Sequence, residues 1–235
     1  MKKPIRAILL AAGLGSRLRP LTNQTPKCLI KIGDKPIIEH WLEKLEEIGC
    51  ESCIINTHYL HDQVNEFIAN RRKSSMKIDL EYEERLLGTA GTLMKNQNFF
   101  KGSIGMLIHA DNATDFKLKP LIECHLGRKA NIIMTMLTFT AENPSSCGIV
   151  EVNQDNILTD FHEKIDSPPG NKANAAVYVI EEEIFNKLPE EVVPTDFSID
   201  FIPRLLGKIQ TLHTSLPFID IGTPSNLEKA RQLWG

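Results

Sequence analysis

Residues 8–27 read ILLAAGLGSRLRPLTNQTPK and join an apolar run, a glycine loop and two well-separated cations. The apolar run is short and leads directly to Gly13 and Gly15, which predicts a buried strand followed by a tight turn. Glycine has no Cβ, so both positions can take a positive φ and let backbone N–H groups approach a phosphate. Arg17 offers a planar fork of donors, and Lys27 offers a point charge. We therefore expect this stretch to hold a nucleoside triphosphate.

Two other phosphate-binding loops fail on specific positions. The Walker A loop ends in Gly-Lys-Ser/Thr, where this chain has Gly15-Ser16-Arg17, and the dinucleotide fingerprint needs a third glycine where Leu18 stands. A bare Gly-x-Gly would favour an ordinary turn with surface cations. The longer string that runs from Leu10 through Thr22 and continues to Lys27 is far more specific.

These residues resemble the signature of the sugar-1-phosphate nucleotidylyltransferases, the pyrophosphorylase family that makes nucleotide sugars. Within that family they are most similar to mannose- or heptose-1-phosphate guanylyltransferases. The similarity covers nearly the whole chain, and it continues through Glu84-x-x-Leu-Gly-Thr-Ala-Gly91, Asp111, Glu163-Lys164, Asn174 and Asp220.

Length and composition bound the class of protein. A chain of 235 residues with 42% hydrophobic and 24% charged residues suits one sizeable globular core. We expect residues 1–235 to form a single nucleotidyltransferase domain without the C-terminal β-helix that longer members of the resembled family append. The net charge of −3 gives no reason to expect nucleic acid or an acidic membrane as a partner.

The sequence predicts no membrane span and no signal peptide, so a cytoplasmic location is expected. Five scattered cysteines do not make a disulfide framework, and Cys50 and Cys53 lack a second ligand pair for zinc. We expect buried or incidental thiols. His58, His61 and His109 are likewise expected to be satisfied histidines and not metal ligands.

Alternating strand and helix patterns predict an α/β fold with a doubly wound, mostly parallel, Rossmann-like mixed sheet. The expected strands cover residues 5–11, 53–57, 77–82, 104–109 and 132–139, and the expected helices cover 36–48, 61–72 and 119–128. Three closely spaced strands at 148–152, 157–164 and 173–180 predict a small antiparallel acceptor-binding lobe, which would make half of a cleft.

The remaining expected elements complete this pattern. Residues 28–31 are expected to be extended. Ser198 is expected to cap a helix that continues to Leu206, and a strand over 212–219 should end at Asp220. Thr223 and Pro224 should begin a last helix that ends at Trp234.

The resemblance implies nucleotidyl transfer, in which a sugar phosphate attacks the α-phosphorus of a nucleoside triphosphate. The protein then neutralises phosphates, aligns the reactants and holds Mg²⁺, which prefers oxygen ligands. Asp111 and Asp220 each follow or end an apolar strand at the expected ligand edge, and they are the candidate metal ligands. A turn or helix cap is the alternative for either residue alone.

A larger set is implied to bind the nucleotide. Thr89 could instead be an N-cap, and Glu84 could simply be solvated. The nucleotide-binding candidates are Leu10, Ala12, Gly13, Gly15, Ser16, Arg17, Lys27, Glu84, Gly88, Thr89 and Ala90.

The acceptor side is implied by a second set, and Lys164 joins Arg17 and Lys27 as a candidate catalytic cation. An alternating strand would place Glu163 and Lys164 on opposite faces, so both can serve only if the strand ends or twists there. The chain has Ala176 where the family usually has glycine. The substrate-binding candidates are Asn112, Gly148, Glu163, Lys164 and Asn174.

Several alternatives stay open. GTP is narrowly favoured, because the Leu-Gly-Thr-Ala-Gly loop is similar to that of guanylyltransferases, whereas the opening Leu-Ala-Ala-Gly also resembles uridylyl and cytidylyl enzymes. A phosphocholine-like acceptor and a non-catalytic regulatory homologue are the other readings. The base, the sugar, the pathway and any homo-oligomer stay open as well.

Overall fold

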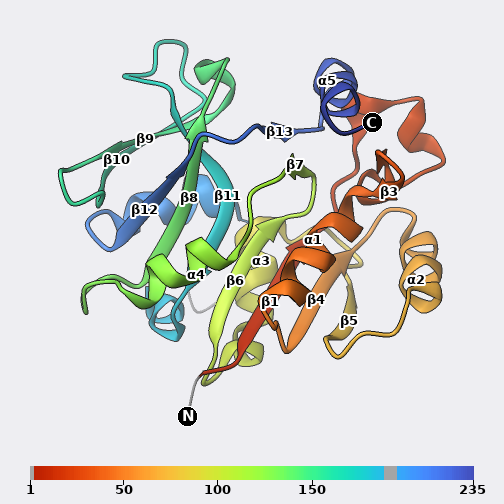
Figure 1. Cartoon of the computed structure of the whole chain (residues 1–235), viewed down its shortest axis with the longest axis horizontal. Coiled ribbons are helices and arrows are strands. Elements are labelled where there is room, and N and C mark those ends of the chain that lie inside the picture. The colour runs from red at the N-terminus through yellow and green to blue at the C-terminus, as the bar shows by residue number, and fades with distance from the viewer. Residues whose placement is uncertain (1–2, 188–194) are drawn as a thin grey trace. The chain divides into compact units, whose positions relative to one another are not determined.

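The computed structural model describes residues 3–187 and 195–235, and the chain divides into two compact units (Figure 1). The parallel unit comprises Ile5–Leu86, Ile108–Asp115 and Pro217–Gly235. The antiparallel unit comprises residues 3–4, Leu87–Leu107 and the described part of Phe116–Leu216. Strand β6 (Ile104–His109) contains the point where the chain passes from the antiparallel to the parallel unit.

The parallel unit is built on three parallel strands with β4 paired to both of the others. All six residues of β4 are buried, as expected for a strand with a neighbour on each side. The strands are β1 (Ile5–Leu10), β4 (Ser52–Thr57) and β5 (Lys77–Tyr82), and the helices are α1 (Ile37–Glu47), α2 (His61–Asn70) and α5 (Pro224–Trp234).

Short elements complete the parallel unit. β7 (Asn112–Thr114) pairs antiparallel with β13 (Phe218–Asp220), and β2 (Lys31–Ile32) pairs with β3 (Lys35–Pro36). Three 3-10 turns follow β1, and they are η1 (Ser16–Leu18), η2 (Leu21–Asn23) and η3 (Lys27–Leu29).

Helix α1 shows why the apolar spacing of the sequence gives this core. Ile37, Ile38, Trp41, Leu42 and Leu45 recur at helical spacing, and each is at most 1% exposed. Full burial of such a side chain contributes about 1.5–3 kcal/mol. The indole N–H of Trp41 donates to the carbonyl of Asn112 at 2.9 Å, so the same helix also fixes the start of β7.

The antiparallel unit surrounds β8 and β11, which pair with each other in antiparallel fashion. β12 pairs parallel with β8, and β9 pairs antiparallel with β10 and β11. The strands are β8 (Met134–Thr140), β9 (Gly148–Val152), β10 (Leu158–Glu163), β11 (Lys172–Ile180) and β12 (Ile209–Thr214), with α3 (Gly88–Lys95) and α4 (Lys119–Leu126). The short helical turns are η4 (Gln97–Phe100), η5 (Pro144–Ser146), η6 (Glu182–Lys187), the π-helix η7 (Phe197–Phe201) and η8 (Ile202–Leu205).

The α/β fold class with a parallel core is therefore confirmed, and the antiparallel strands lie where the sequence predicted them. Among the described residues, no helix has both the length and the apolar character needed to cross a bilayer.

Several element boundaries were wrong. Residues 28–31 are not simply extended, because a 3-10 turn covers Lys27–Leu29. Ser198 does not cap its helix. Asp196 does, and its carboxylate accepts from the backbone N–H groups of Ser198 and Ile199. The strand expected over 212–219 is two strands, β12 and β13, and the helix expected over 119–128 already ends at Leu126.

Candidate active site

Two carboxylates far apart in sequence meet at one ammonium group in the parallel unit. Lys27 Nζ lies 2.6 Å from Asp111 Oδ2 and 3.0 Å from Asp220 Oδ1. The Lys27 side chain is 10% exposed, whereas those of Asp111 and Asp220 are 31% and 51% exposed. The cation is thus enclosed by protein, while the carboxylates still reach solvent.

The pairing of β7 with β13 brings these carboxylates together. Asp220 lies opposite Asn112 in that register, and the N–H of Ile221 donates to the carbonyl of Asp111 at 3.0 Å. Asn112 is buried, and its side chain donates to the carbonyl of His109 at 3.4 Å. The sequence prediction that Asp111 and Asp220 converge is confirmed as geometry.

The charges of this cluster support one another. Burial alone would lower the pKa of Lys27, but the charges of Asp111 and Asp220 outweigh burial and raise it. Burial alone would raise the pKa of Asp111, but the charges of Lys27 and His109 lower it. The cluster therefore holds an ammonium beside an ionised Asp111 carboxylate at neutral pH.

Gly222 leaves the space in which this cluster assembles. A Cβ at this position would lie 2.8 Å from each of three atoms, Arg17 Nη2, Asp220 Oδ1 and Lys27 Nζ. The Gly222 N–H also donates to Asp220 Oδ1 at 2.7 Å. Arg17 is exposed and lies beside the same carboxylate, so both candidate cations of the signature stretch reach one place.

The two glycines of the signature stretch differ in what they do. Gly15 has φ +61°, and a Cβ there would lie 2.8 Å from Thr22 Cγ2, so this glycine serves the packing of the loop on Thr22. The Thr22 hydroxyl also donates to the Gly15 carbonyl at 2.8 Å. Gly13 is exposed, and a Cβ there would meet nothing within 4 Å. Gly15 takes the positive φ that glycine allows, whereas Gly13 does not.

The start of the loop is held by residues that the sequence reasoning missed. The N–H of Ala11 donates to Asn56 Oδ1 at 2.7 Å, and Asn56 Nδ2 donates to Glu83 Oε1 at 3.0 Å. Both Asn56 and Glu83 are buried. The parallel register that pairs Leu10 with Asn56 explains this contact, and pairing cannot be read from one strand alone.

The remaining candidate site residues of the parallel unit lie at the ends of its strands or in the turns that follow them. Leu10 is the last residue of β1, and Ala12 is buried just after it. Ser16 is exposed at the start of η1, and Glu84 is exposed after β5. The exposure of Glu84 agrees with the solvated alternative.

In the antiparallel unit, Thr195 and Phe197 hold the Thr89 loop, by which we mean Leu87 and the first turn of helix α3 with Gly88, Thr89 and Ala90. Gly88 has φ +74°, and a Cβ there would clash with the Thr195 carbonyl. Thr89 does not cap its helix, because helix α3 has no side-chain cap bond and the Thr89 hydroxyl instead accepts from the N–H of Phe197 at 2.7 Å. The N-cap alternative for Thr89 was therefore wrong.

Glu163 and Lys164 lie together because β10 ends between them. Lys164 has φ +49°, which breaks the alternation of the strand, and its Nζ lies 3.0 Å from Glu163 Oε1. Gly148 lies opposite Glu163 in the β9–β10 pair, and a Cβ there would lie 2.6 Å from Glu163 Oε2. The expectation that the strand must end for both side chains to serve agrees with this geometry.

Asn174 lies at an irregular part of β11. The pairing with β8 shifts between Asn174 and Tyr178, and Ala176 has φ +53°, a conformation that favours glycine. Asn174 Oδ1 accepts from the N–H of Ala176 at 2.9 Å, and Asn174 Nδ2 donates to the Tyr178 hydroxyl at 2.6 Å. Tyr178 is fully buried, and the sequence reasoning did not single it out.

The cysteines and most of the histidines are structural. Cys50 and Cys53 are buried, and burial raises the pKa of both thiols, that of Cys50 to about 12. His58 Nδ1 lies 2.7 Å from the carbonyl of Glu83. His61 and His109 differ, because the buried Nδ1 of His61 and the buried Nε2 of His109 have no hydrogen-bond partner among the described residues, so the expectation that these two histidines are satisfied was wrong. The charge of His109 also acts on Asp111.

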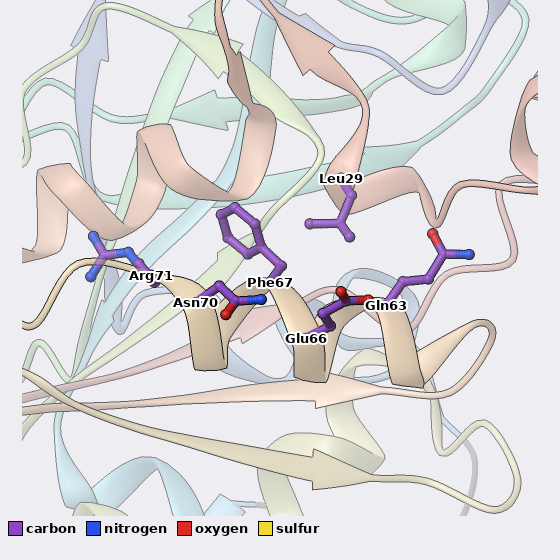
Figure 2. A pocket seen from close by; sticks show the side chains of 6 residues that line it. All are labelled: Leu29, Gln63, Glu66, Phe67, Asn70 and Arg71. Atoms are coloured by element: carbon purple, nitrogen blue, oxygen red, sulfur yellow. The ribbon is translucent and has the colours of Figure 1, made fainter.

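An open pocket of about 470 Å³ lies elsewhere on the parallel unit. Figure 2 shows five of its side chains on or just beyond helix α2, with Leu29 facing them. Its Arg71 already pairs with Glu39 and Glu46, so that guanidinium is occupied by protein carboxylates. The pocket contains none of the candidate site residues, and its lining is Leu29, Gln63, Glu66, Phe67, Asn70 and Arg71.

Comparisons with known proteins agree with this geometry. A family model described as nucleotidyl transferase matches residues 6–234. The chain is 30% identical over 228 residues to a mannose-1-phosphate guanylyltransferase catalytic subunit beta from Drosophila melanogaster, which covers 94% of this chain and 60% of that protein. It is 29% identical over 229 residues to a mannose-1-phosphate guanylyltransferase 1 from Arabidopsis thaliana, covering 94% and 62%. The chain thus spans about three fifths of the length of these curated relatives.

Solved structures show the same fold. A Bacillus anthracis structure in complex with sucrose, provisionally assigned as a glucose-1-phosphate thymidylyltransferase, superposes with a TM-score of 0.88 at 22% identity and covers 97% of this chain and 94% of its own. HddC from Yersinia pseudotuberculosis complexed with GMP-PN has a TM-score of 0.79 at 22% identity and covers 98% and 99%. Because the family model extends over nearly the entire chain, this protein belongs to the nucleotidyl transferase family.

Proposed function

We propose that this protein transfers a nucleoside monophosphate from a nucleoside triphosphate to a sugar 1-phosphate and releases pyrophosphate. The observation that carries this proposal is the cluster of Lys27, Asp111 and Asp220 beside Arg17. Such a cluster combines cations for phosphate oxygens with carboxylates for a divalent metal. Because the family match extends through both units, we treat residues 1–235 as one nucleotidyltransferase domain in this proposal.

The chemistry requires little covalent work from the protein. An oxygen of the sugar phosphate forms a bond to the α-phosphorus, and the bond from that phosphorus to the β-phosphate oxygen breaks. A phosphate monoester has its second pKa near 6, so most of it is a dianion at neutral pH and needs no general base. The side chains therefore act by positioning the reactants and by stabilising charge.

Asp111 and Asp220 would hold Mg²⁺ in this proposal. Lys27 supports this assignment, because its ammonium is a cation already held between both carboxylates. Carboxylate oxygens are the ligands that Mg²⁺ prefers, and triphosphate oxygens and waters would complete its coordination. When bound, the metal neutralises phosphate charge and favours departure of pyrophosphate.

The signature stretch would bind the triphosphate. The open space at Gly13 leaves backbone N–H groups accessible, and Ser16 and Arg17 are exposed beside them. Arg17 would form paired hydrogen bonds to phosphate oxygens, and Lys27 would supply a point charge. Leu10 and Ala12 would shape the floor of this site.

Most of the residues proposed to read the base and bind the acceptor belong to the antiparallel unit, whereas Glu84 and Asn112 belong to the parallel unit. The Thr89 hydroxyl accepts from Phe197, so its own proton can still donate to a base acceptor. Gly88, Ala90 and Glu84 complete the proposed set for the base. Lys164 is 65% exposed and would hold the acceptor phosphate. The residues proposed to contact the sugar are Asn112, Gly148, Glu163 and Asn174.

We propose guanine as the base and GTP as the nucleotide donor, and two observations support this choice. The relatives at 29–30% identity are named mannose-1-phosphate guanylyltransferases, and a fold neighbour was solved with GMP-PN. The neighbour with the TM-score of 0.88 carries a thymidylyltransferase assignment, so the fold itself does not discriminate between bases. Uridylyl and cytidylyl transfer are the alternatives.

The decisive experiment is pyrophosphate release by the purified chain with each of GTP, UTP, CTP, ATP and dTTP. Each triphosphate is paired with mannose, glucose and heptose 1-phosphates and with phosphocholine, with and without Mg²⁺. We expect GTP with a sugar 1-phosphate and Mg²⁺ to give the highest rate. Release with phosphocholine alone would reassign the acceptor. No release in any combination would reject transfer and favour a non-catalytic homologue.

A further inference from the structure

One short segment of the antiparallel unit binds the loop proposed to read the base. The N–H of Thr195 donates to the carbonyl of Leu87 at 3.0 Å, and the Thr195 carbonyl accepts from the N–H of Ala90 at 3.1 Å. The N–H of Phe197 donates to the Thr89 hydroxyl at 2.7 Å. Three hydrogen bonds therefore join residues 195–197 to this loop, and Gly88 has no Cβ that would prevent the approach.

The same segment reaches a residue proposed to bind the sugar. Ser198 hydrogen-bonds the Tyr178 hydroxyl, and that hydroxyl accepts from Asn174 Nδ2 at 2.6 Å. The negative charge of Glu163 also acts on Tyr178. The Tyr178 hydroxyl is thus the point at which the segment meets two of the acceptor residues.

Packing holds the segment in one arrangement. Phe197 is fully buried, and its ring lies 5.0 Å from the ring of Tyr178 and 6.1 Å from that of Phe201, centroid to centroid. The Asp196 carboxylate accepts from two N–H groups of the turn that follows, and the N–H of Asp196 donates to Asp200. A displacement of residues 195–198 by the Thr89 loop therefore also displaces the Phe197 ring, which contacts Tyr178.

We propose that residues 195–198, through Ser198 and Tyr178, are a positioning element that transmits a movement of the Thr89 loop to Asn174, so that binding of the triphosphate, by ordering this loop, tightens binding of the sugar phosphate. This inference rests on the proposed function. Neither Tyr178 nor Ser198 needs to touch a substrate in it. Coupling of this kind between two ligands is typically about 5-fold to 150-fold in affinity.

The test uses Tyr178→Phe and Ser198→Ala in the full chain, with Tyr82→Phe and Ser145→Ala as matched controls. Tyr82 is 50% exposed, and Ser145 is exposed in η5, so their hydroxyls lie outside this network. The measurements are the KM of each substrate, kcat, and the affinity for the sugar 1-phosphate with and without a non-hydrolysable triphosphate analogue.

In the unmodified protein, the analogue is expected to tighten sugar phosphate binding by about 5-fold or more. Tyr178→Phe and Ser198→Ala are expected to reduce that factor to near one and to raise the KM of the sugar phosphate about 5-fold, with kcat changed less. A purely structural role would instead lower the melting temperature and leave the factor intact. That result, or the same coupling factor and KM in the variants and their controls, would overturn this inference and leave the proposed function standing. No pyrophosphate release by the unmodified protein would overturn it together with the proposed function.

Discussion

Two charged clusters, one in each unit, differ in exposure. In the parallel unit, Lys27 lies between Asp111 and Asp220, whose side chains are 31% and 51% exposed. In the antiparallel unit, His125 and Glu181 are 0% and 5% exposed by side chain. Carboxylates that reach solvent can accept a ligand, whereas enclosed carboxylates can only serve the protein.

The enclosed cluster is satisfied from every side. Glu181 accepts from Lys3 at 2.8 Å, and Arg128 Nη2 lies 2.6 Å from its other oxygen. His125 Nε2 lies 3.2 Å from Glu181 Oε1, and Nδ1 lies 2.8 Å from the Thr135 hydroxyl. Because a carboxylate only accepts, the proton of the neutral imidazole lies on Nε2, and Thr135 donates to Nδ1. No oxygen of Glu181 is left over for a ligand, which is the mark of a structural cluster.

The largest expected effect comes from replacing one carboxylate by its amide in each of the two clusters and comparing the results. Asp111→Asn should lower pyrophosphate release about 100-fold to 1,000-fold, because the amide cannot supply the charge that a metal requires. Its free energy of unfolding should fall less than that of Glu181→Gln, since the Lys27 ammonium keeps Asp220 as a partner. Glu181→Gln should lower the free energy of unfolding by about 3 kcal/mol and leave kcat nearly unchanged.

Both variants are measured by pyrophosphate release and by urea denaturation at pH 7. Near-normal turnover of Asp111→Asn would reject its assignment as a metal ligand. Loss of activity by folded Glu181→Gln would show that the exposure of a charged cluster does not distinguish its role.

The sequence predicted the open cluster much better than the enclosed one. Asp111 and Asp220 each lie next to an apolar strand and match a motif, so their roles could be proposed without knowledge of their contacts to Lys27, which are 2.6 Å for Asp111 and 3.0 Å for Asp220. His125 and Glu181 have no motif, and only the packing of α4 against β8 and β11 brings them together. Local sequence patterns predict where strands end and where loops lie. Contacts between buried side chains depend on how distant elements pack, which local patterns do not predict.

The same distinction explains the missed and misplaced residues. Asn56 meets Ala11 through the register of β1 with β4, which a single strand does not encode. The cap at η7 is Asp196 and not Ser198, a shift of two residues that decides which side chain is left to bond Tyr178. Gly222 follows Asp220 closely in the sequence, but its need for space arises only from the three charged side chains around it.

A second prediction sharpens the comparison through pH. Burial and the nearby charge of Arg128 lower the pKa of His125 from 6.5 to about 4, although Glu181 acts in the opposite direction. The folded protein therefore resists a proton that the unfolded chain accepts below pH 6.5. This contribution to stability is present above pH 6.5 and is lost as the pH falls toward 4, and its size is about 3 kcal/mol.

The measurement is the free energy of unfolding at several values between pH 7 and pH 4.5, for the unmodified protein and for His125→Gln. Carboxylates also titrate in the lower part of this range, so the informative quantity is the difference between the two proteins. That difference should shrink as the pH falls. A difference that is independent of pH would mean that folding does not shift the pKa of His125.

The smallest expected effect concerns Lys27 itself. Its ammonium contacts both carboxylates at 2.6 Å and 3.0 Å, so it competes with any divalent cation for the same oxygens. Lys27→Met removes the competing ammonium and keeps most of the apolar stem. It should raise the affinity for Mn²⁺, measured without nucleotide, by about 10-fold. Removal of one unit charge at an effective dielectric constant of about 20 allows an effect of this size. The same variant should raise the KM of the triphosphate more than that of the sugar phosphate, because Lys27 is proposed to contact phosphate. Mn²⁺ binding followed by electron paramagnetic resonance tests the first part independently of turnover, and Lys35→Met, which removes an ammonium paired with Glu43, is the matched control. Weaker Mn²⁺ binding by Lys27→Met would mean that the lysine organises the two carboxylates for the metal and does not compete with it.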